Sequence, residues 1–146
     1  MDHAIGENFA ASMRSKIESK AFLDPGSFQD MLADEVKLFT PRFWSPITDR
    51  NWMIGILCMV PQAIENFTYE RHWVAGSEVF MEFTGNVGKY SLQGLDIFTI
   101  EDDGKIKELT VMVRPPNALE ALGAVEDKML KELFGVATQA EFKEQA

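Results

Sequence analysis

Residues 78–116 read EVFMEFTGNVGKYSLQGLDIFTIEDDGKIKELTVMVRPP, and this stretch decides the fold. It contains three strand-length runs of apolar or alternating residues, at 79–84, 90–100 and 106–114. Glycine-containing turn sequences separate these runs at 85–88 and 102–105, and the second carries an Asp-Gly pair that is typical of a hairpin. The stretch therefore predicts a meander of three antiparallel strands with one acid, Asp96, in an otherwise apolar sheet.

The residues before the meander predict helices and two further strands. Apolar residues recur every three or four positions over 4–21, which indicates an amphipathic helix that Asp24-Pro25-Gly26 stops. Ser27 then begins a short second helix that should end near Asp34. A strand, a helix capped by Thr48 or Asp49 with Pro61 at its end or at a kink, and another strand follow, at 36–39, 50–60 and 64–74.

The residues after the meander predict one long helix. Asn117 can cap it, and Gly135 marks its end. Its apolar face is formed by Leu119, Leu122, Val125, Met129 and Leu133, with a possible break at Gly123. The tail to Ala146 is expected to be another short helix or a frayed end. This helix can cover the pocket, add to a dimer interface or simply dock on the core, and we favour the interface.

The order of helices, antiparallel strands and a terminal helix is that of the α+β class. At 146 residues the chain fits one domain, with a core at about 4–122 and a C-terminal helical extension at 123–146. A strongly bent antiparallel sheet with helices over one face is the most economical arrangement. The 11 Phe, 3 Trp and 8 Met residues suit a core that encloses a ligand cavity, although a plain packed core uses them too.

Charge and composition exclude several classes of function. The net charge of -9 argues against nucleic-acid binding, which needs clustered Lys and Arg to neutralise phosphates. The single cysteine, Cys58, lies in an apolar run and reads as a small buried hydrophobe. Two scattered histidines and one cysteine indicate no metal site, and no glycine loop indicates a phosphate-binding cofactor. Without an N-terminal signal pattern or a run of about 18 apolar residues, the chain is expected to be cytoplasmic and to have no membrane partner.

Several segments carry a family resemblance. The chain resembles the SnoaL-like branch of the nuclear transport factor two-like superfamily over almost its whole length up to about Leu122. The matching segments in and after the meander are FTGNVG at 83–88, LQGLDIF at 92–98, DGKI at 103–106, ELTVMVRP at 108–115 and ALEAL at 118–122. Earlier matching segments are LADEV at 32–36, Thr40-Pro41 and Asp49-Arg50.

The resemblance implies a curved sheet whose concave face and N-terminal helices enclose an apolar pocket for a small apolar or polycyclic molecule. It also implies a homodimer through the sheet. By similarity to ketosteroid isomerase, Asp96 matches the pocket acid that stays protonated and donates a hydrogen bond to the substrate oxyanion. The general base and the first-helix tyrosine of that enzyme correspond to Thr40 and Lys16 here, so the resemblance argues against steroid isomerisation by that mechanism.

The residues give three candidates for acid or base chemistry: Asp96, His72 and Tyr69. Without a β-bulge in the hairpin, Asp96 shares a sheet face with Leu109, Val111 and Val113, which favours an interior position over the surface. An acid in an apolar cavity must be paired, hydrogen-bonded or protonated. His72 can assist it as a base but is more often a surface or core residue, and Tyr69 can offer its hydroxyl but more often covers a sheet edge.

The candidate pocket wall is apolar, with one cation at its edge. Arg114 can bind a ligand carboxylate at the pocket rim, or can form an ion pair at the strand end. The aromatic and aliphatic residues can line the pocket or form ordinary core. The predicted lining residues are Phe39, Trp44, Trp52, Met81, Phe83, Leu109, Val111 and Val113.

Two functions remain open from the sequence. The first is a small-molecule-binding domain without chemistry, which Thr40 at the position of the base favours. The second is an isomerase, aldol cyclase or hydratase without a cofactor, in which Asp96 acts as acid or base. The presence of an acid at position 96 favours this alternative.

Overall fold

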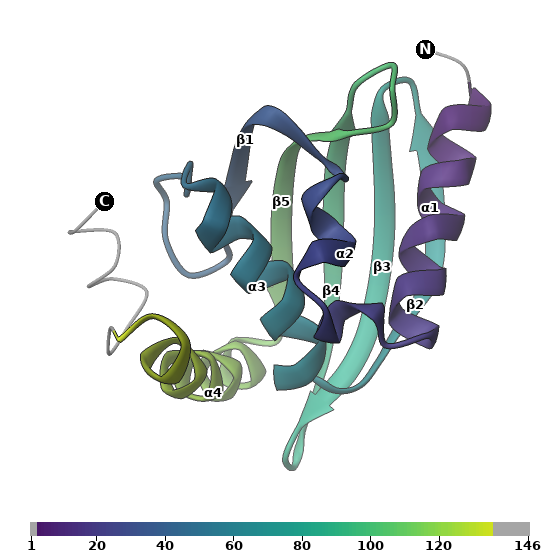
Figure 1. Ribbon diagram of the computed structural model, residues 1–146. Coiled ribbons are helices and arrows are strands. Elements are labelled where there is room, and N and C mark those ends of the chain that lie inside the picture. Colours follow the sequence, from purple (N-terminus) through teal and green to yellow (C-terminus); the bar gives the residue numbers. More distant parts are fainter. Residues whose placement is uncertain (1–2, 136–146) are drawn as a thin grey trace.

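The computed structural model describes residues 3–135, and its helices pack on one face of a five-stranded sheet (Figure 1). The strand order is β1-β5-β4-β3-β2. The strands are β1 (Leu32–Phe39), β2 (Glu65–Ala75), β3 (Glu78–Val87), β4 (Tyr90–Ile100) and β5 (Ile106–Arg114). The helices are α1 (His3–Glu18), the short 3-10 turn η1 (Ala21–Leu23), α2 (Gly26–Gln29), α3 (Arg50–Ala63) and α4 (Pro116–Phe134).

The predicted meander is confirmed. Strands β3, β4 and β5 pair antiparallel in chain order, and the bounds of β4 and β5 match the prediction. Strand β3 continues beyond its predicted end, because the turn is confined to Gly88 and Lys89 between Val87 and Tyr90. Gly88 has a φ of 57°, in the left-handed region that a two-residue hairpin turn requires.

The predicted second helix is too long. Helix α2 ends at Gln29, and Leu32–Asp34 belong to β1, which pairs parallel with β5. Burial explains the difference, because Leu32 and Ala33 face the core where a strand joins the sheet edge, at 1% and 4% exposure. The sheet is therefore mixed, with an antiparallel meander and β2 on one side and a parallel edge strand on the other.

Helix α3 begins at a predicted cap but ends later than predicted. Asp49 caps it, because the Asp49 carboxylate accepts a hydrogen bond of 2.9 Å from the Trp52 backbone N–H. Pro61 does not end the helix, which continues to Ala63. The Gln62 side chain donates to the Cys58 carbonyl at 3.0 Å, so this last turn gains a side-chain hydrogen bond beside the proline.

Helix α4 runs without a break through Gly123 and ends at Gly135, whose φ is 72°. Gly123 is needed for packing, because a Cβ at this position would lie 2.9 Å from the Arg42 side-chain Nε. The helix contacts α3 and strands β3, β4 and β5. It therefore closes one end of the helix-covered face (Figure 1), and its addition to a dimer interface stays a prediction. The predicted structure of the tail lies outside the described residues.

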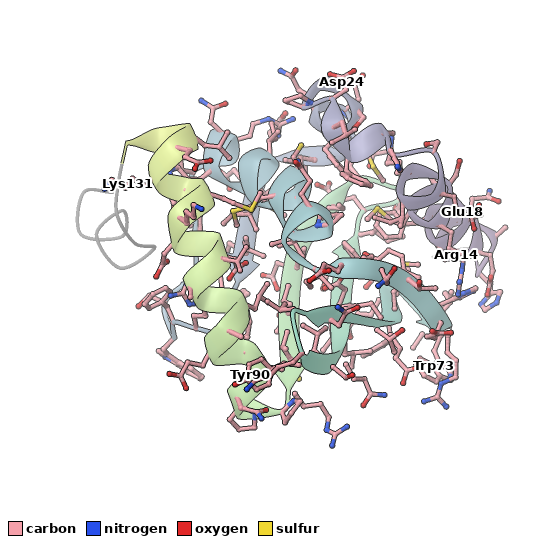
Figure 2. All side chains as sticks on the ribbon, turned by 90° about the horizontal axis from the view of Figure 1, so that it is seen from below. Arg14, Glu18, Asp24, Trp73, Tyr90 and Lys131 are labelled. Carbon is pink, nitrogen blue, oxygen red and sulfur yellow. The ribbon has the colours of Figure 1, made fainter. Side chains whose placement is uncertain are left out.

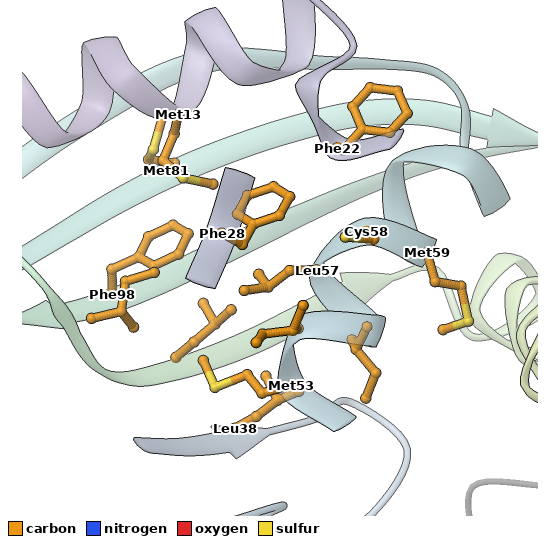
Figure 3. Close-up of a cluster of buried hydrophobic side chains, with 14 of the residues drawn as sticks. Met13, Phe22, Phe28, Leu38, Met53, Leu57, Cys58, Met59, Met81 and Phe98 are labelled. Atoms are coloured by element: carbon orange, nitrogen blue, oxygen red, sulfur yellow. The ribbon is translucent and has the colours of Figure 1, made fainter. Parts of the chain in front are cut away.

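The core fills the space between the helices and the sheet (Figure 3). Met13 of α1, Phe28 of α2 and Leu57 of α3 meet Met81 and Phe98 of the sheet there. We call this helix-covered side the inner face and the opposite side the outer face. Each buried side chain of this size contributes about 1.5–3 kcal/mol to the free energy of unfolding, so this layer fixes the helices on the inner face.

The register places Asp96 on the inner face. Asp96 pairs with Val111 of β5 and with Met81 of β3, and both neighbours point the same way as Asp96. The β4–β5 pairing is irregular between Thr99 and Ile100, on the turn side of Asp96, and it is regular from Thr99 to Gln93, which sets Asp96 opposite Val111. The expectation that Asp96 shares a face with Leu109, Val111 and Val113 is confirmed.

Candidate functional site

A cavity of about 50 Å³ lies on the inner face with Asp96 in its wall. Tyr69 is the other side chain of the wall that carries a polar group, and no cationic side chain of the described chain lines it. Elements from the whole inner face contribute the remaining lining: Met13, Ile17, Phe28, Leu38, Ile56, Leu57, Val60, Pro61, Phe67, Leu109 and Val111. The site is therefore a nearly closed apolar space with one carboxyl and one phenol.

Asp96 and Tyr69 form a buried hydrogen-bonded pair. The Tyr69 hydroxyl lies 2.7 Å from Asp96 Oδ2, and both residues are 7% exposed. Strand β3 separates their strands, so the Tyr69 side chain reaches across the sheet above Phe83, its register partner. Among the described residues, Tyr69 is the one hydrogen-bond partner of the Asp96 carboxyl. The second carboxyl oxygen is thus left for another group.

Burial changes the protonation of both groups. It raises the pKa of Asp96 from 3.8 to about 7, and the hydrogen bond from Tyr69 offsets part of this rise. The pKa of Tyr69 is raised well above its usual value by burial and by the Asp96 charge, so the phenol keeps its proton. Near neutral pH a large fraction of Asp96 is a neutral carboxylic acid that can donate a hydrogen bond.

A second cavity of about 30 Å³ adjoins the first along four shared wall residues, Leu38, Ile56, Val60 and Val111. Its wall contains the carboxyl of Glu126 from α4, which is 5% exposed. Burial raises the pKa of Glu126 from 4.5 to about 7, against the opposing effect of Arg42. Two buried carboxyl groups, Asp96 on β4 and Glu126 on α4, therefore lie in the walls of adjoining apolar cavities.

The structure places His72 away from this cavity wall. His72 Nδ1 lies 2.9 Å from Arg14 Nη2, and His72 Nε2 lies 2.8 Å from Glu7 Oε2. Because the guanidinium can only donate, Nδ1 accepts, and the Nε2–H donates to the Glu7 carboxylate. Both ring nitrogens are thus used to attach α1 to β2. This geometry gives His72 a structural contact in place of the predicted assistance to Asp96.

The predicted lining residues lie in four different parts of the structure: the two cavities, the core and a surface groove. Leu109 and Val111 line the Asp96 cavity, and Phe83 and Val113 line the second cavity. Met81 and Trp52 are buried in the core at 0% and 3% exposure, outside the walls of both cavities. Phe39 and Trp44 lie instead in a wider surface groove of about 740 Å³, where Trp44 is 96% exposed.

Arg114, Thr40 and Lys16 have other contacts. Arg114 is on the outer face, where its guanidinium donates to Gln93 Oε1 at 3.1 Å, so the predicted rim position is corrected. Thr40 lines the second cavity, and its hydroxyl accepts backbone N–H groups of the following loop. The Lys16 ammonium donates to the Ser27 carbonyl at 2.8 Å. Neither Thr40 nor Lys16 replaces the missing base.

The sequence reasoning missed Glu126 and Arg42. The buried stripe of α4 is formed by Ala118, Leu122, Glu126 and Leu130 at four-residue spacing, whereas Leu133 of the predicted face is 59% exposed. An acid within an apolar stripe at this spacing is a signal that could have identified Glu126. Arg42 follows a proline in a loop, and its position carries no comparable signal.

No protein-family model matches the sequence, and no curated protein matches it. Solved structures do match. A steroid delta-isomerase from Pseudomonas aeruginosa has a TM-score of 0.82 and 27% sequence identity, covering 91% of this chain and 96% of its own. An uncharacterised bacterial protein with a cystatin-like fold from Silicibacter pomeroyi DSS-3 has a TM-score of 0.76 and 25% identity, with coverages of 93% and 90%.

An NTF2-like protein of unknown function from Cytophaga hutchinsonii has a TM-score of 0.60 at 10% identity, covering 78% of this chain and 94% of its own, which bears on the fold alone. The chain therefore has the cystatin-like fold of the nuclear transport factor two-like proteins. The predicted α+β class, with a curved sheet, N-terminal helices and a C-terminal helix, is confirmed.

In residues 3–135, no helix is long and apolar enough to span a membrane, and no three His, Cys, Asp or Glu side chains could together hold a metal ion.

The buried carboxyl groups predict an unusual dependence of stability on pH. The folded state holds a proton on Asp96 up to about pH 7, whereas the unfolded chain releases it near 3.8, so the free energy of unfolding falls as pH rises between these values. Glu126 acts in the same direction. Urea denaturation between about pH 4 and pH 8 should show this fall, and Asp96→Asn should remove roughly 2–4 kcal/mol of it.

Asn retains an acceptor for the Tyr69 hydroxyl but cannot titrate, which makes it the matched substitution. The double variant Asp96→Leu with Tyr69→Phe removes both partners together, so no buried hydroxyl is left unpaired, and it should flatten the profile to the same extent. A wild-type profile that rises over this pH range would contradict the assignment of a raised Asp96 pKa.

Proposed function

We propose that this protein binds a small apolar carbonyl compound on the inner face and holds its oxygen at Asp96 and Tyr69. The observation that supports the proposal most is the Tyr69–Asp96 hydrogen bond of 2.7 Å inside an apolar cavity. Cavities with apolar walls and a few converging polar groups are the usual form of small-molecule sites. Within the superfamily, we place the chain in the SnoaL-like branch on the strength of the segments at 83–98 and 103–122.

The chemistry of the pair suits a ligand oxygen. The Tyr69 hydroxyl donates its one proton to Asp96 Oδ2, so a neutral Asp96 is free to donate from its other carboxyl oxygen. A carbonyl oxygen can accept this hydrogen bond, whereas a cationic ligand group would leave the donor without an acceptor. The donor becomes stronger in an apolar surrounding, so an oxygen that gains negative charge is favoured further.

The size of the cavity limits the ligand in this closed form. About 50 Å³ is far below the roughly 300–1,000 Å³ of sites for drug-sized ligands. A single ring is therefore the largest group that small movements of Met13, Ile17 and Phe28 could admit. A polycyclic ligand would require α1 and α2 to move away from the sheet.

A second candidate function is a cofactor-free isomerase, aldol cyclase or hydratase that acts through an enolate. The 27% identity to a protein described as a steroid delta-isomerase, with near-complete coverage of both chains, favours it. A neutral Asp96, held in place by the Tyr69 hydroxyl, would stabilise the enolate oxygen as a preorganised donor. Such an enzyme also needs a base, and neither Thr40 nor Lys16 can act as one in this arrangement.

We also propose a homodimer through the outer face of the sheet. No helix of the described chain covers this face, and Trp73 and Met112 are exposed on it at 47% and 53%. In Figure 2, Trp73 lies on the side of the sheet away from α1. Next to them runs a row of polar side chains linked by hydrogen bonds across four strands: Arg71, Glu82, Gln93 and Arg114. Because these polar groups are already paired with one another, a second copy could cover them at low desolvation cost.

The ligand proposal predicts binding of 4-fluorophenol, a one-ring compound whose oxygen resembles an enolate oxygen. Titration followed by ¹⁹F NMR should show saturable binding to the wild type. The double variant Asp96→Leu with Tyr69→Phe should weaken it about tenfold or more, because the hydrogen-bond donor to the ligand oxygen is lost. Asp102→Leu, which removes an exposed carboxyl in the β4–β5 turn, is the control and should bind like the wild type. Equal affinity of the wild type and the double variant would contradict the proposal.

The dimer proposal predicts a solution mass of about twice 16.5 kDa by light scattering. Met112→Glu should yield monomers, because a charge in the centre of an apolar contact is costly to bury. Leu133→Glu places the same charge on α4 at a similarly exposed position and should leave the dimer intact. A monomeric wild type would rule out this interface.

A further inference from the structure

Packing alone does not explain why the buried residue at position 126 carries a carboxyl group. Glu126 occupies the buried stripe of α4 between Leu122 and Leu130, where an aliphatic residue would pack without cost. At 5% exposure, a carboxyl at this position lowers stability unless it is compensated.

The side chains around Glu126 compensate it only in part. Arg42 makes its two short contacts with Asp127, at 2.9 and 3.0 Å, and lies 3.8 Å from Glu126. No hydrogen bond to the Glu126 carboxyl occurs among residues 3–135. Asp127 thus holds the guanidinium, and the Glu126 oxygens remain open to a group in the cavity.

The cavity next to Glu126 leads toward Asp96. Both carboxyls belong to walls that share Leu38, Ile56, Val60 and Val111, so a ligand lying along these four side chains meets both groups. The two carboxyls differ in surroundings. Glu126 has a guanidinium within ion-pair distance, which favours its ionised form, whereas Asp96 has the Tyr69 phenol and no cation in its cavity wall.

We propose that Glu126 is the general base of this site, supplied by the C-terminal helix, and that it moves a carbon-bound proton of the ligand held at Asp96 and Tyr69. The inference rests on the proposed binding function and turns the enolising alternative into a specific mechanism. A Glu126 oxygen takes the proton from a carbon next to the carbonyl. The C–H electron pair forms the enolate double bond, and the carbonyl π electrons move to the oxygen.

The enolate oxygen accepts the hydrogen bond of the neutral Asp96 carboxyl, whose other oxygen accepts from the Tyr69 hydroxyl. Protonated Glu126 then returns the proton to the same carbon or to the γ-carbon of a β,γ-unsaturated ketone, which restores the carbonyl. No electrons leave the ligand and no co-reactant is consumed. The substrate class is thus a small apolar ketone with an acidic C–H beside the carbonyl, and the net reaction is isomerisation or exchange of that hydrogen.

The test uses cyclohex-3-enone as a one-ring β,γ-unsaturated ketone. Conversion to the conjugated isomer is followed by absorbance, and hydrogen exchange into the ketone is followed by ¹H NMR in deuterated water. The wild type should accelerate both over buffer. Glu126→Gln should lose about 10²–10⁴-fold of this rate while 4-fluorophenol binding stays within about twofold of the wild type. Glu120→Gln, an exposed acid on the same helix, is the control and should keep the wild-type rate.

Each outcome separates the two proposals. Wild-type binding of 4-fluorophenol without turnover, or an unchanged rate in Glu126→Gln, overturns the role of Glu126 and leaves the binding function standing. Absence of 4-fluorophenol binding overturns the binding function and this inference with it. If Glu126→Gln does not fold, Glu126→Asp keeps the charge but shortens its reach, and it must still lose about tenfold or more of the rate.

Discussion

The burial of the Asp96 carboxyl in a wall of aliphatic and aromatic side chains is the constraint on which the rest of the site depends. An ionised carboxylate in such a place is too costly without a cation, and the surrounding wall contains none. The group therefore takes up a proton and a phenol partner. Everything that we propose about ligand class follows from this neutral, donating form of the acid.

The hydrogen-bond partner of Asp96 comes from strand β2. The helix that supplies a tyrosine in ketosteroid isomerase carries Lys16 here, and Lys16 is used to bind the Ser27 carbonyl. Tyr69 reaches Asp96 from β2 instead, across the intervening strand β3. At the other end of the apolar space, α4 brings a second carboxyl where the loop offers only Thr40. The same kinds of groups are thus arranged from different elements.

Local patterns in the sequence predicted the features that depend on short-range geometry. Alternation and the Asp-Gly turn were sufficient for the meander, whereas the face of Asp96 also depended on whether the hairpin carries a bulge and on the family resemblance. Patterns could not predict that Leu32 joins a parallel edge strand, because short apolar runs suit a helix end as well as a strand. Tyr69 was a candidate, but its contact with Asp96 depends on the order of strands in the sheet, which local patterns do not give. Glu126 and Arg42 meet only through tertiary packing of α4 on the 40–49 loop.

The protonation state of Asp96 tests the account most directly. A ¹³C NMR titration of the Asp96 carboxyl, assigned by its absence in an Asp96→Asn spectrum, gives that pKa in the folded protein. The account predicts a midpoint near pH 7, and a higher midpoint in Tyr69→Phe because the Tyr69 hydrogen bond lowers the pKa of Asp96. A midpoint near the ordinary value of 3.8 would mean that the carboxyl is solvated and ionised, and it would contradict the account.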